Sequence, residues 1–204
     1  VEYFFNVSAY IYVDNGSSDG TAKTLKFISK DDKKVKVVSI KKNIGYGFGI
    51  KRGIAEVSSS MILLNHADLQ FKPSSFFHSN IDKLSKLMEP LNIFPKRLNR
   101  PLFDKFNSAT LRIILSIIYA HQVKDFNGQP KLMFKEDISN LKILPEDFCI
   151  DLQFYNLCKG KALILPVIQE LRFTGESSWN TNIFKRIRIF FSYIFFALKK
   201  SHNT

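Results

Sequence analysis

Three polar loops, each following a short apolar run, carry most of the side chains that could do chemistry. The first loop is DNGSSDGT, residues 14–21, and it follows the β-rich run of residues 10–13. A carboxylate at a strand end, here Asp14, can accept from a base or a ribose, and free N–H groups at a helix start suit phosphate. The same residue types also form turns and helix caps. Both interpretations of this loop, a nucleotide pocket and a capped turn, stay open.

The second loop, residues 65–70, follows the apolar run of residues 61–64. In an extended chain alternate residues share a side, so we expect His66, Asp68 and Gln70 to face the same way. An imidazole, a carboxylate and an amide oxygen could share a divalent ion. Oxygen ligands favour Mg²⁺ or Mn²⁺, and His66 shifts the preference slightly toward Mn²⁺. The alternative is that these are ordinary solvated side chains at a strand end.

The third loop is rich in glycine and precedes an expected helix that ends near residue 57. Gly47, Gly49 and Gly53 follow the predicted strand of residues 35–40. Their spacing does not fit G-x-G-x-x-G, and no acid occupies the ribose position of a dinucleotide site. We therefore interpret these glycines as permitting close packing of a helix on a sheet.

The elements that must position these loops alternate between strand and helix. Strands are expected at residues 10–13, 35–40 and 61–64, with a helix at residues 21–29 and another after the glycine loop. This alternation predicts an α/β fold with a mostly parallel sheet flanked by helices, and ligands bind at the carboxyl ends of such strands. The apolar third strand is typical of a buried parallel sheet. Further on we expect helices at 108–123 and 148–159 and a strand at 162–166.

Composition limits the class of protein. The 204 residues are 45% apolar, enough for one main domain, and 30 basic against 18 acidic residues give a net charge of +12. This excess indicates an acidic partner, although most lysines also serve as a solvated face. No nucleic-acid-binding module is recognisable, so we expect no nucleic-acid partner. Two cysteines exclude a disulfide framework and a four-cysteine zinc site, and no apolar run is long enough to span a bilayer.

Taken in order, three segments resemble family 2 glycosyltransferases of the GT-A fold. They are VDNGSSDGT at residues 13–21, NIGYGFGIKRGIA at 43–55 and NHADLQ at 65–70. The resemblance implies that the nucleotide is bound by four residues, and that the third segment carries the metal although His66 replaces the usual acid. The four residues are Asp14, Asn15, Asp19 and Asn43.

Three later segments resemble the branch related to dolichol-phosphate mannosyltransferases. They are DFNGQPK at 125–131, DFCIDL at 147–152 and RFTGESSW at 172–179. The resemblance implies an inverting, metal-dependent transfer of a sugar from a nucleotide-diphosphate donor. The acceptor would be a polyprenyl or dolichyl phosphate, or another glycan acceptor. Gln129, Lys131 and Arg172 are the expected acceptor-binding residues.

The need for a general base depends on the acceptor. A phosphate oxygen is already ionised at neutral pH, so it needs positioning by cations rather than a strong base. For a hydroxyl acceptor, Asp147 or Asp151 is the candidate base. Glu146 and Asp147 also follow Pro145, and acids there suit a helix start equally well.

The family's first strand and its P-x-Y-N-E segment have no counterpart in residues 1–8. We expect residues 1–180 to be a glycosyltransferase domain that lacks its first strand, and we favour a fragment of a longer product. Two alternatives remain. One is a catalytically impaired binding module of the same fold. The other is a nucleotidyltransferase, although the glycine-rich signature with Lys or Arg that is usual in that class is not present.

Residues 181–204 predict a basic amphipathic helix. Ile183, Ile187 and Leu198 recur at helical spacing, and Lys185 and Arg188 fall on the other side. The pattern is typical of a helix lying on an anionic leaflet. We therefore expect a peripheral protein on the cytoplasmic face of a membrane. The alternative is a helix packed against the domain or leading into transmembrane helices.

Overall fold

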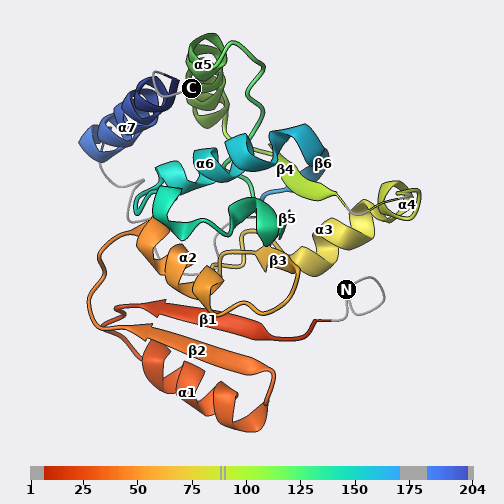
Figure 1. Cartoon of the computed structure of the whole chain (residues 1–204), viewed down its shortest axis with the longest axis vertical. Coiled ribbons are helices and arrows are strands. Elements are labelled where there is room, and N and C mark those ends of the chain that lie inside the picture. Colours follow the sequence, from red (N-terminus) through yellow and green to blue (C-terminus); the bar gives the residue numbers. More distant parts are fainter. Residues whose placement is uncertain (1–6, 88, 90, 171–182, 202–204) are drawn as a thin grey trace.

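The computed structural model describes residues 7–87, 89, 91–170 and 183–201, and it shows an α/β protein (Figure 1). The first half has the predicted alternation of strands and helices. Its polar loops follow β1, β2 and β3, as the sequence indicates. These elements are β1 (Tyr10–Asn15), α1 (Thr21–Asp31), β2 (Val35–Ile40), α2 (Tyr46–Ala55) and β3 (Met61–Leu64).

The second half contains more elements than the sequence pattern predicts. Its predicted helices and strand are present as α5, α6, β6 and α7, whereas α3, α4, β4 and β5 were not predicted. α5 begins six residues before the predicted helix and ends at Ile118. The elements are α3 (Pro73–Ser79), α4 (Ile81–Leu84), β4 (Asn92–Leu98), α5 (Leu102–Ile118), β5 (Lys131–Phe134), α6 (Cys149–Cys158), β6 (Ala162–Ile168), α7 (Ile183–Ser201) and the short 3-10 turns η1 (Glu136–Ile138), η2 (Leu141–Ile143) and η3 (Lys159–Lys161).

The strands form two sheets. β1 and β2 pair in parallel, and the second sheet has the order β3-β5-β4-β6. β4 and β6 are parallel, whereas β5 runs antiparallel to both of its neighbours. The α/β prediction is confirmed, but the expected parallel setting of β3 is corrected. β3 pairs only with the antiparallel β5 among the described strands, and in it only Ile62 is buried.

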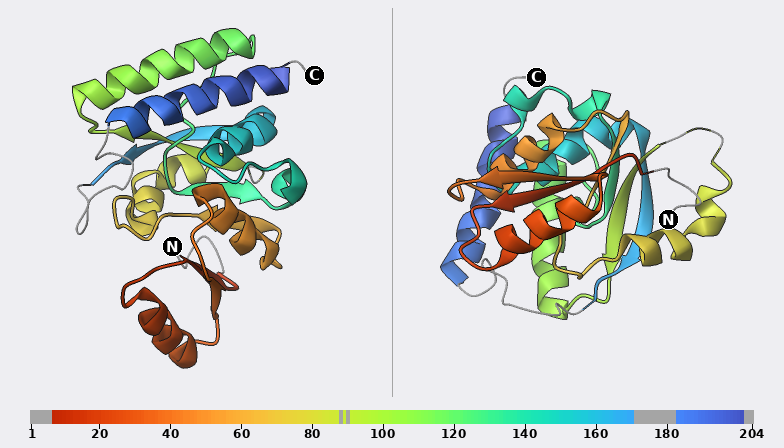
Figure 2. Two further views of the ribbon diagram at one scale, coloured as in Figure 1. Left: turned by 90° about the vertical axis from the view of Figure 1, so that its left-hand side faces the viewer. Right: turned by 90° about the horizontal axis from the view of Figure 1, so that it is seen from below.

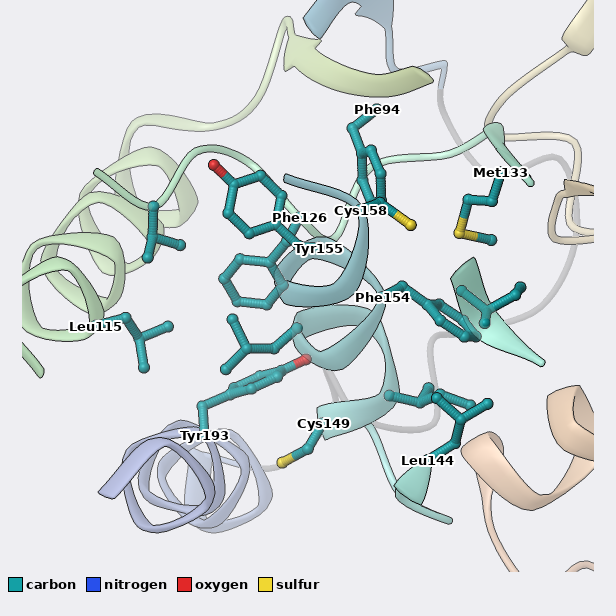
Figure 3. Close-up of a cluster of buried hydrophobic side chains, with 14 of the residues drawn as sticks. Phe94, Leu115, Phe126, Met133, Leu144, Cys149, Phe154, Tyr155, Cys158 and Tyr193 are labelled. Carbon is teal, nitrogen blue, oxygen red and sulfur yellow. The ribbon is translucent and has the colours of Figure 1, made fainter. Parts of the chain in front are cut away.

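Helices cover the four-stranded sheet on both faces. On one face α6 is almost entirely buried, and Leu152 and Phe154 pack in a cluster with Phe94 of β4 and Met133 of β5 (Figure 3). A second cluster joins Phe77 of α3 to β4, β5 and β6. The packed sheet therefore fixes the end of β3 and the start of α6. Residues of the candidate site lie at both places.

The glycines of α2 allow this helix to approach β1 closely. A Cβ on Gly53 would lie 2.9 Å from Cγ2 of Val13, and one on Gly49 would lie 3.1 Å from the Asn15 side chain. The sequence-based interpretation of these two glycines as packing residues is confirmed. The close approach sets α2 against the end of β1.

The C-terminal helix α7 packs on the domain along one side. Tyr193 and Ala197 are buried, and the Tyr193 hydroxyl donates to the Phe148 carbonyl and also lies 3.1 Å from Oδ1 of Asn127. The opposite side of α7 stays exposed. No helix within the described part of the chain is long and apolar enough to cross a membrane.

Candidate functional site

Asp14 is the next-to-last residue of β1, where a tight turn begins. Its side chain is buried, and its Oδ1 accepts a hydrogen bond of 2.9 Å from the backbone N–H of Ser17. Gly16 follows with a φ of +77°, and a Cβ there would lie 2.5 Å from the backbone nitrogen of Asn43. Only glycine combines this conformation with this contact. The turn therefore holds Asp14 against the loop that follows β2.

Asn15 ties the same two loops together through its amide group. Nδ2 donates to the Gly45 carbonyl at 3.1 Å and to Oδ1 of Asn43 at 3.3 Å. Its Oδ1 is buried and finds no hydrogen-bond donor within the part of the chain that the structure describes. A buried acceptor of this kind costs free energy unless a ligand or water donates to it. Because this oxygen has almost no exposed surface, a donor reaches it only if the surrounding loops move.

Asp19 is fully exposed and takes part in the start of α1. Its Oδ1 accepts from the backbone N–H of Thr21 at 2.9 Å. Hydrogen bonds from the Thr21 side chain and backbone lower the pKa of Asp19 below its ordinary value. Asp19 therefore forms a turn just before α1, whose N-cap residue is Gly20.

The loop after β3 is a turn rather than an extended segment. Leu69 has a φ of +59°, and Oδ1 of Asp68 accepts from the backbone N–H of Gln70 at 3.1 Å. The expected alternation of His66, Asp68 and Gln70 along an extended chain is therefore corrected. Within the described ranges, no three His, Cys, Asp or Glu side chains lie close enough to hold a metal ion.

His66 is joined to Tyr46, the first residue of α2. The distance between Nε2 of His66 and the Tyr46 hydroxyl is 2.7 Å, and the two rings meet edge to face. Burial, followed by the negative charge of Asp151, raises the pKa of Tyr46 well above its ordinary value, so Tyr46 keeps its proton.

Which nitrogen of His66 carries the proton sets the direction of this hydrogen bond. Tyr46 was not predicted as a site residue, although an aromatic residue between Gly45 and Gly47 in a candidate loop could have drawn attention to it.

Beneath this pair lies a buried ion pair between β5 and α6. Nζ of Lys131 lies 2.6 Å from Oδ1 of Asp151, and the exposed fraction of the Lys131 side chain is 0%. Burial lowers the pKa of Lys131, and Asp151 partly offsets this effect. Gln129 is also fully buried. With its amide turned to match its neighbours, its nitrogen donates to the Leu64 carbonyl and its oxygen accepts from Lys131.

This burial corrects three sequence-based assignments. Gln129 and Lys131 have no surface on which to bind an acceptor phosphate. Asp151, predicted as a candidate base, instead neutralises Lys131. These three buried side chains have a structural role next to the site. Arg172, the remaining acceptor candidate, lies outside the described residues.

Asp147 is exposed and stands beside the glycine loop. Its Oδ1 accepts from the backbone N–H of Cys149 at 2.9 Å, so it does take the predicted helix-start role. It also lines a cavity of about 290 Å³ together with Gly45 and Ser192. A Cβ on Gly47 would lie 2.4 Å from the Pro145 carbonyl, which shows how tightly the two loops pack. Asp147 is therefore an accessible carboxylate next to the loop that carries Asn43.

The α/β fold, the loops that meet at the ends of β1 and β2, and α2 packed behind them define the GT-A class, a fold shared with solved glycosyltransferase structures. The model of the family described as "Glycosyl transferase family 2" matches residues 6–158, and the chain belongs to this family. The branch suggested by the later motifs is not resolved by this match.

Two comparisons place the chain among known proteins. An uncharacterized glycosyltransferase of Synechocystis sp. is 22% identical over 171 residues, which cover 83% of this chain and 54% of that protein. The chain therefore spans about half the length of this relative. Glucosyl-3-phosphoglycerate synthase from Mycobacterium tuberculosis, crystallised with Mn²⁺, UDP and glucosyl-3-phosphoglycerate, has a TM-score of 0.65 and 13% identity, over 95% of this chain and 68% of that one.

The same enzyme crystallised with Mn²⁺, UDP-glucose and glycerol 3-phosphate has a TM-score of 0.62 and 14% identity, over 94% of this chain and 68% of that one. At such identities the likeness establishes the fold alone.

Proposed function

We propose that this chain is a glycosyltransferase that moves a sugar from a nucleotide-diphosphate donor to a lipid phosphate, with inversion and with help from a divalent metal. The observation that carries the proposal is that Asp14, Asn15 and Asn43, within the segment that matches the family, meet at the ends of β1 and β2. Oxygen acceptors gathered there match the N–H and O–H donors of a base or ribose. An enzyme of the same fold, crystallised with UDP and with UDP-glucose, supports the choice of donor.

The residues after β3 fit a divalent ion that is held largely by the diphosphate. Asp68 contributes a carboxylate, whose Oδ1 accepts from the backbone N–H of Gln70, and His66 contributes an imidazole. Mg²⁺ or Mn²⁺ is commonly bound by one or two carboxylates together with substrate phosphates, so a cluster of three acids is not required. The ion supplies neutralisation of charge on the leaving diphosphate. The Mn²⁺ in the related crystals supports this assignment.

The reaction needs little covalent chemistry from the protein. An oxygen of the acceptor attacks the anomeric carbon from the side opposite the diphosphate, so a new C–O bond forms as the old one breaks. The electron pair of the broken bond leaves with the nucleoside diphosphate, and the configuration inverts. An ionised phosphate has no proton to lose. With a hydroxyl acceptor, Asp147 takes the proton, because it is exposed beside the glycine loop.

A lipid phosphate also accounts for the charge and the C-terminal helix. The chain carries a net charge of +12, and α7 is basic with an exposed apolar side. We place the protein at the cytoplasmic face of a membrane as a peripheral protein, where nucleotide sugar and lipid phosphate meet.

The proposal is tested by a transfer assay. Labelled nucleotide sugars are incubated with the protein, Mn²⁺ and vesicles that contain a polyprenyl phosphate, and the lipid phase is counted. Matched vesicles containing the unphosphorylated polyprenol are the control. We expect label in the phosphate vesicles only, with one nucleoside diphosphate released per sugar transferred. Equal transfer to the two lipids contradicts the lipid-phosphate acceptor, and no release of nucleoside diphosphate from any donor contradicts the glycosyltransferase activity.

A further inference from the structure

The helix α5 lies beside α7, and the two run in the same direction. At their first turns Arg186 of α7 forms an ion pair of 2.5 Å with Asp104 of α5, and its guanidinium lies over the ring of Phe103. At the other end the Ser201 hydroxyl is 3.4 Å from the Ile118 carbonyl. The pair covers one end of the molecule (Figure 2).

Both helices leave large apolar side chains in solvent. Half of the exposed large apolar side chains of the described residues lie on α5 and α7. On α5 they are Leu102, Phe103, Phe106, Ile113 and Ile117. On α7 they are Ile183, Phe184, Ile187, Phe191, Phe195 and Leu198. An apolar surface of this kind on a folded protein marks an interaction site.

The charges on these helices select the partner. α5 and α7 contain seven cations, and Asp104 is their single acid. Asp104 already pairs with Arg186, so the rest of the surface is positive. The combination of exposed aromatic and aliphatic side chains with Lys and Arg fits an anionic bilayer, because the apolar groups enter the acyl boundary while the cations meet lipid headgroups.

A cavity beneath α5 has the same character. It measures about 900 Å³, and its walls combine the cations Lys96, Arg112 and Lys124 with the side chains of Ile113 and Ile117. Asp125 also lines the cavity, but it is held by Arg97 in a two-pronged ion pair. The cavity therefore places cationic groups beside the apolar face of α5, where an anionic headgroup can bind.

We propose that α5 and α7 together form the surface that docks on an anionic bilayer. This inference rests on the peripheral membrane association proposed above and extends it from α7 to α5. A tail acting alone would leave the exposed side chains of α5 in water. With both helices engaged, the domain rests on the membrane along the length of α5.

The test is flotation of the full chain with vesicles of phosphatidylcholine and phosphatidylserine. Phe106→Asp and Ile117→Asp change α5 side chains that are 70% and 75% exposed. The matched control is Phe27→Asp, because Phe27 is 67% exposed on α1 at the far end of the molecule (Figure 1). We expect each α5 variant to reduce vesicle binding at least tenfold, and the control to bind as the unaltered protein does.

Two further measurements keep the outcome interpretable. Thermal unfolding and calorimetric binding of UDP with Mn²⁺ are measured for every variant, and both should be unchanged. Retained vesicle binding by the α5 variants overturns the proposal in favour of α7 alone. Loss of self-association instead of vesicle binding, measured by light scattering, overturns it in favour of a second copy of the chain. Failure of UDP binding in the unaltered protein would count against the proposed function and not against this surface.

Discussion

The nitrogen and the oxygen of the Asn15 side-chain amide have different surroundings. Its nitrogen joins the loop after β1 to the loop after β2, and its oxygen stays buried without a donor among the described residues. Asp14 was a candidate because it lies at a strand end, and the family resemblance added Asn15 and Asn43. The sequence could not show which atom was left without a partner, since this depends on the packing of α2 against β1.

Replacing Asp14 by Asn separates binding from folding. Asn keeps an Oδ1 that can accept from Ser17, so the turn is preserved and the unfolding free energy should change by less than about 1 kcal/mol. Loss of the negative charge weakens a hydrogen bond to the ligand. We expect nucleotide affinity to fall about tenfold or more by calorimetry, because bonds to charged groups contribute about 1.5–3 kcal/mol. A large drop in the thermal midpoint with intact affinity contradicts this role.

Replacing Tyr46 by Phe tests the contact between Tyr46 and His66. The ring still stacks on Phe148, so the fold should hold, but Nε2 of His66 loses its hydrogen-bond partner. We expect about a tenfold weaker affinity for UDP with Mn²⁺, since loss of such outer contacts commonly weakens metal affinity ten- to a hundredfold. The affinity measured with a chelator should be unchanged. Tyr10→Phe, on an exposed side chain of β1, is the control.

At the scale of elements, the glycine loop and the loop before α6 form one packed unit. The backbone N–H of Phe48 donates to the Glu146 carbonyl at 3.0 Å, and Lys51 forms an ion pair with the Glu146 side chain at 3.1 Å. Glycine spacing predicted close packing in α2. The partner at Gly45 and Gly47, a loop a hundred residues later, could not be predicted, because spacing in one segment does not identify the segment it contacts.

Gly47→Ala should separate these two loops. Its Cβ would lie 2.4 Å from the Pro145 carbonyl oxygen. Because this oxygen belongs to the backbone, moving it away costs free energy. Overpacking of this kind costs about 1–3 kcal/mol, and we expect nucleotide binding to weaken with it. Gly20→Ala is the matched control, because no atom lies within 4 Å of a Cβ there. Chemical unfolding of the two variants measures the difference, and equal stability of both contradicts the packing argument.

The ion pair between Lys131 and Asp151 joins β5 to α6. It allows a test of whether Asp151 acts as a catalytic base or as a structural residue. Asp151→Asn leaves the buried ammonium of Lys131 without a counter-charge, so we expect a loss of about 3–5 kcal/mol in unfolding free energy. The double change Lys131→Met and Asp151→Leu removes both charges and should recover much of that loss. If the Asn variant unfolds like the unaltered protein but has lost activity, Asp151 is a base after all.

Strand order and direction were the least predictable features of the fold. β4 contains Pro95, Lys96 and Arg97, and β5 begins with the buried Lys131. Neither segment therefore has the apolar pattern that predicts a strand. The antiparallel setting of β5 follows from the path of the chain after α5, which no local period encodes. By contrast, β2 and β3 have the predicted bounds, because their short apolar runs are flanked by clear turn signals.

At the scale of the whole molecule, the site loops and the exposed helices have different chemistry. The loops after β1, β2 and β3 present carboxylate and amide groups, whereas α5 and α7 present apolar and cationic groups. Composition predicted an acidic partner, and the apolar period predicted α7. The contribution of α5 emerged only from the structure, because its exposed side also carries large apolar residues such as Ile113 and Ile117.

Calorimetric titration of UDP into the full chain, with Mn²⁺ and then with a chelator, tests whether these loops bind a nucleoside diphosphate together with a metal. We predict that the affinity for UDP weakens at least tenfold when the metal is removed. We also predict that Asp68→Ala reduces the affinity with metal to the affinity measured with chelator, because Asp68 is the carboxylate proposed to hold the ion. Other nucleoside diphosphates are titrated in the same way to identify the base. If no nucleoside diphosphate binds, or if the affinity is the same with metal, with chelator and in Asp68→Ala, the account of this site is contradicted.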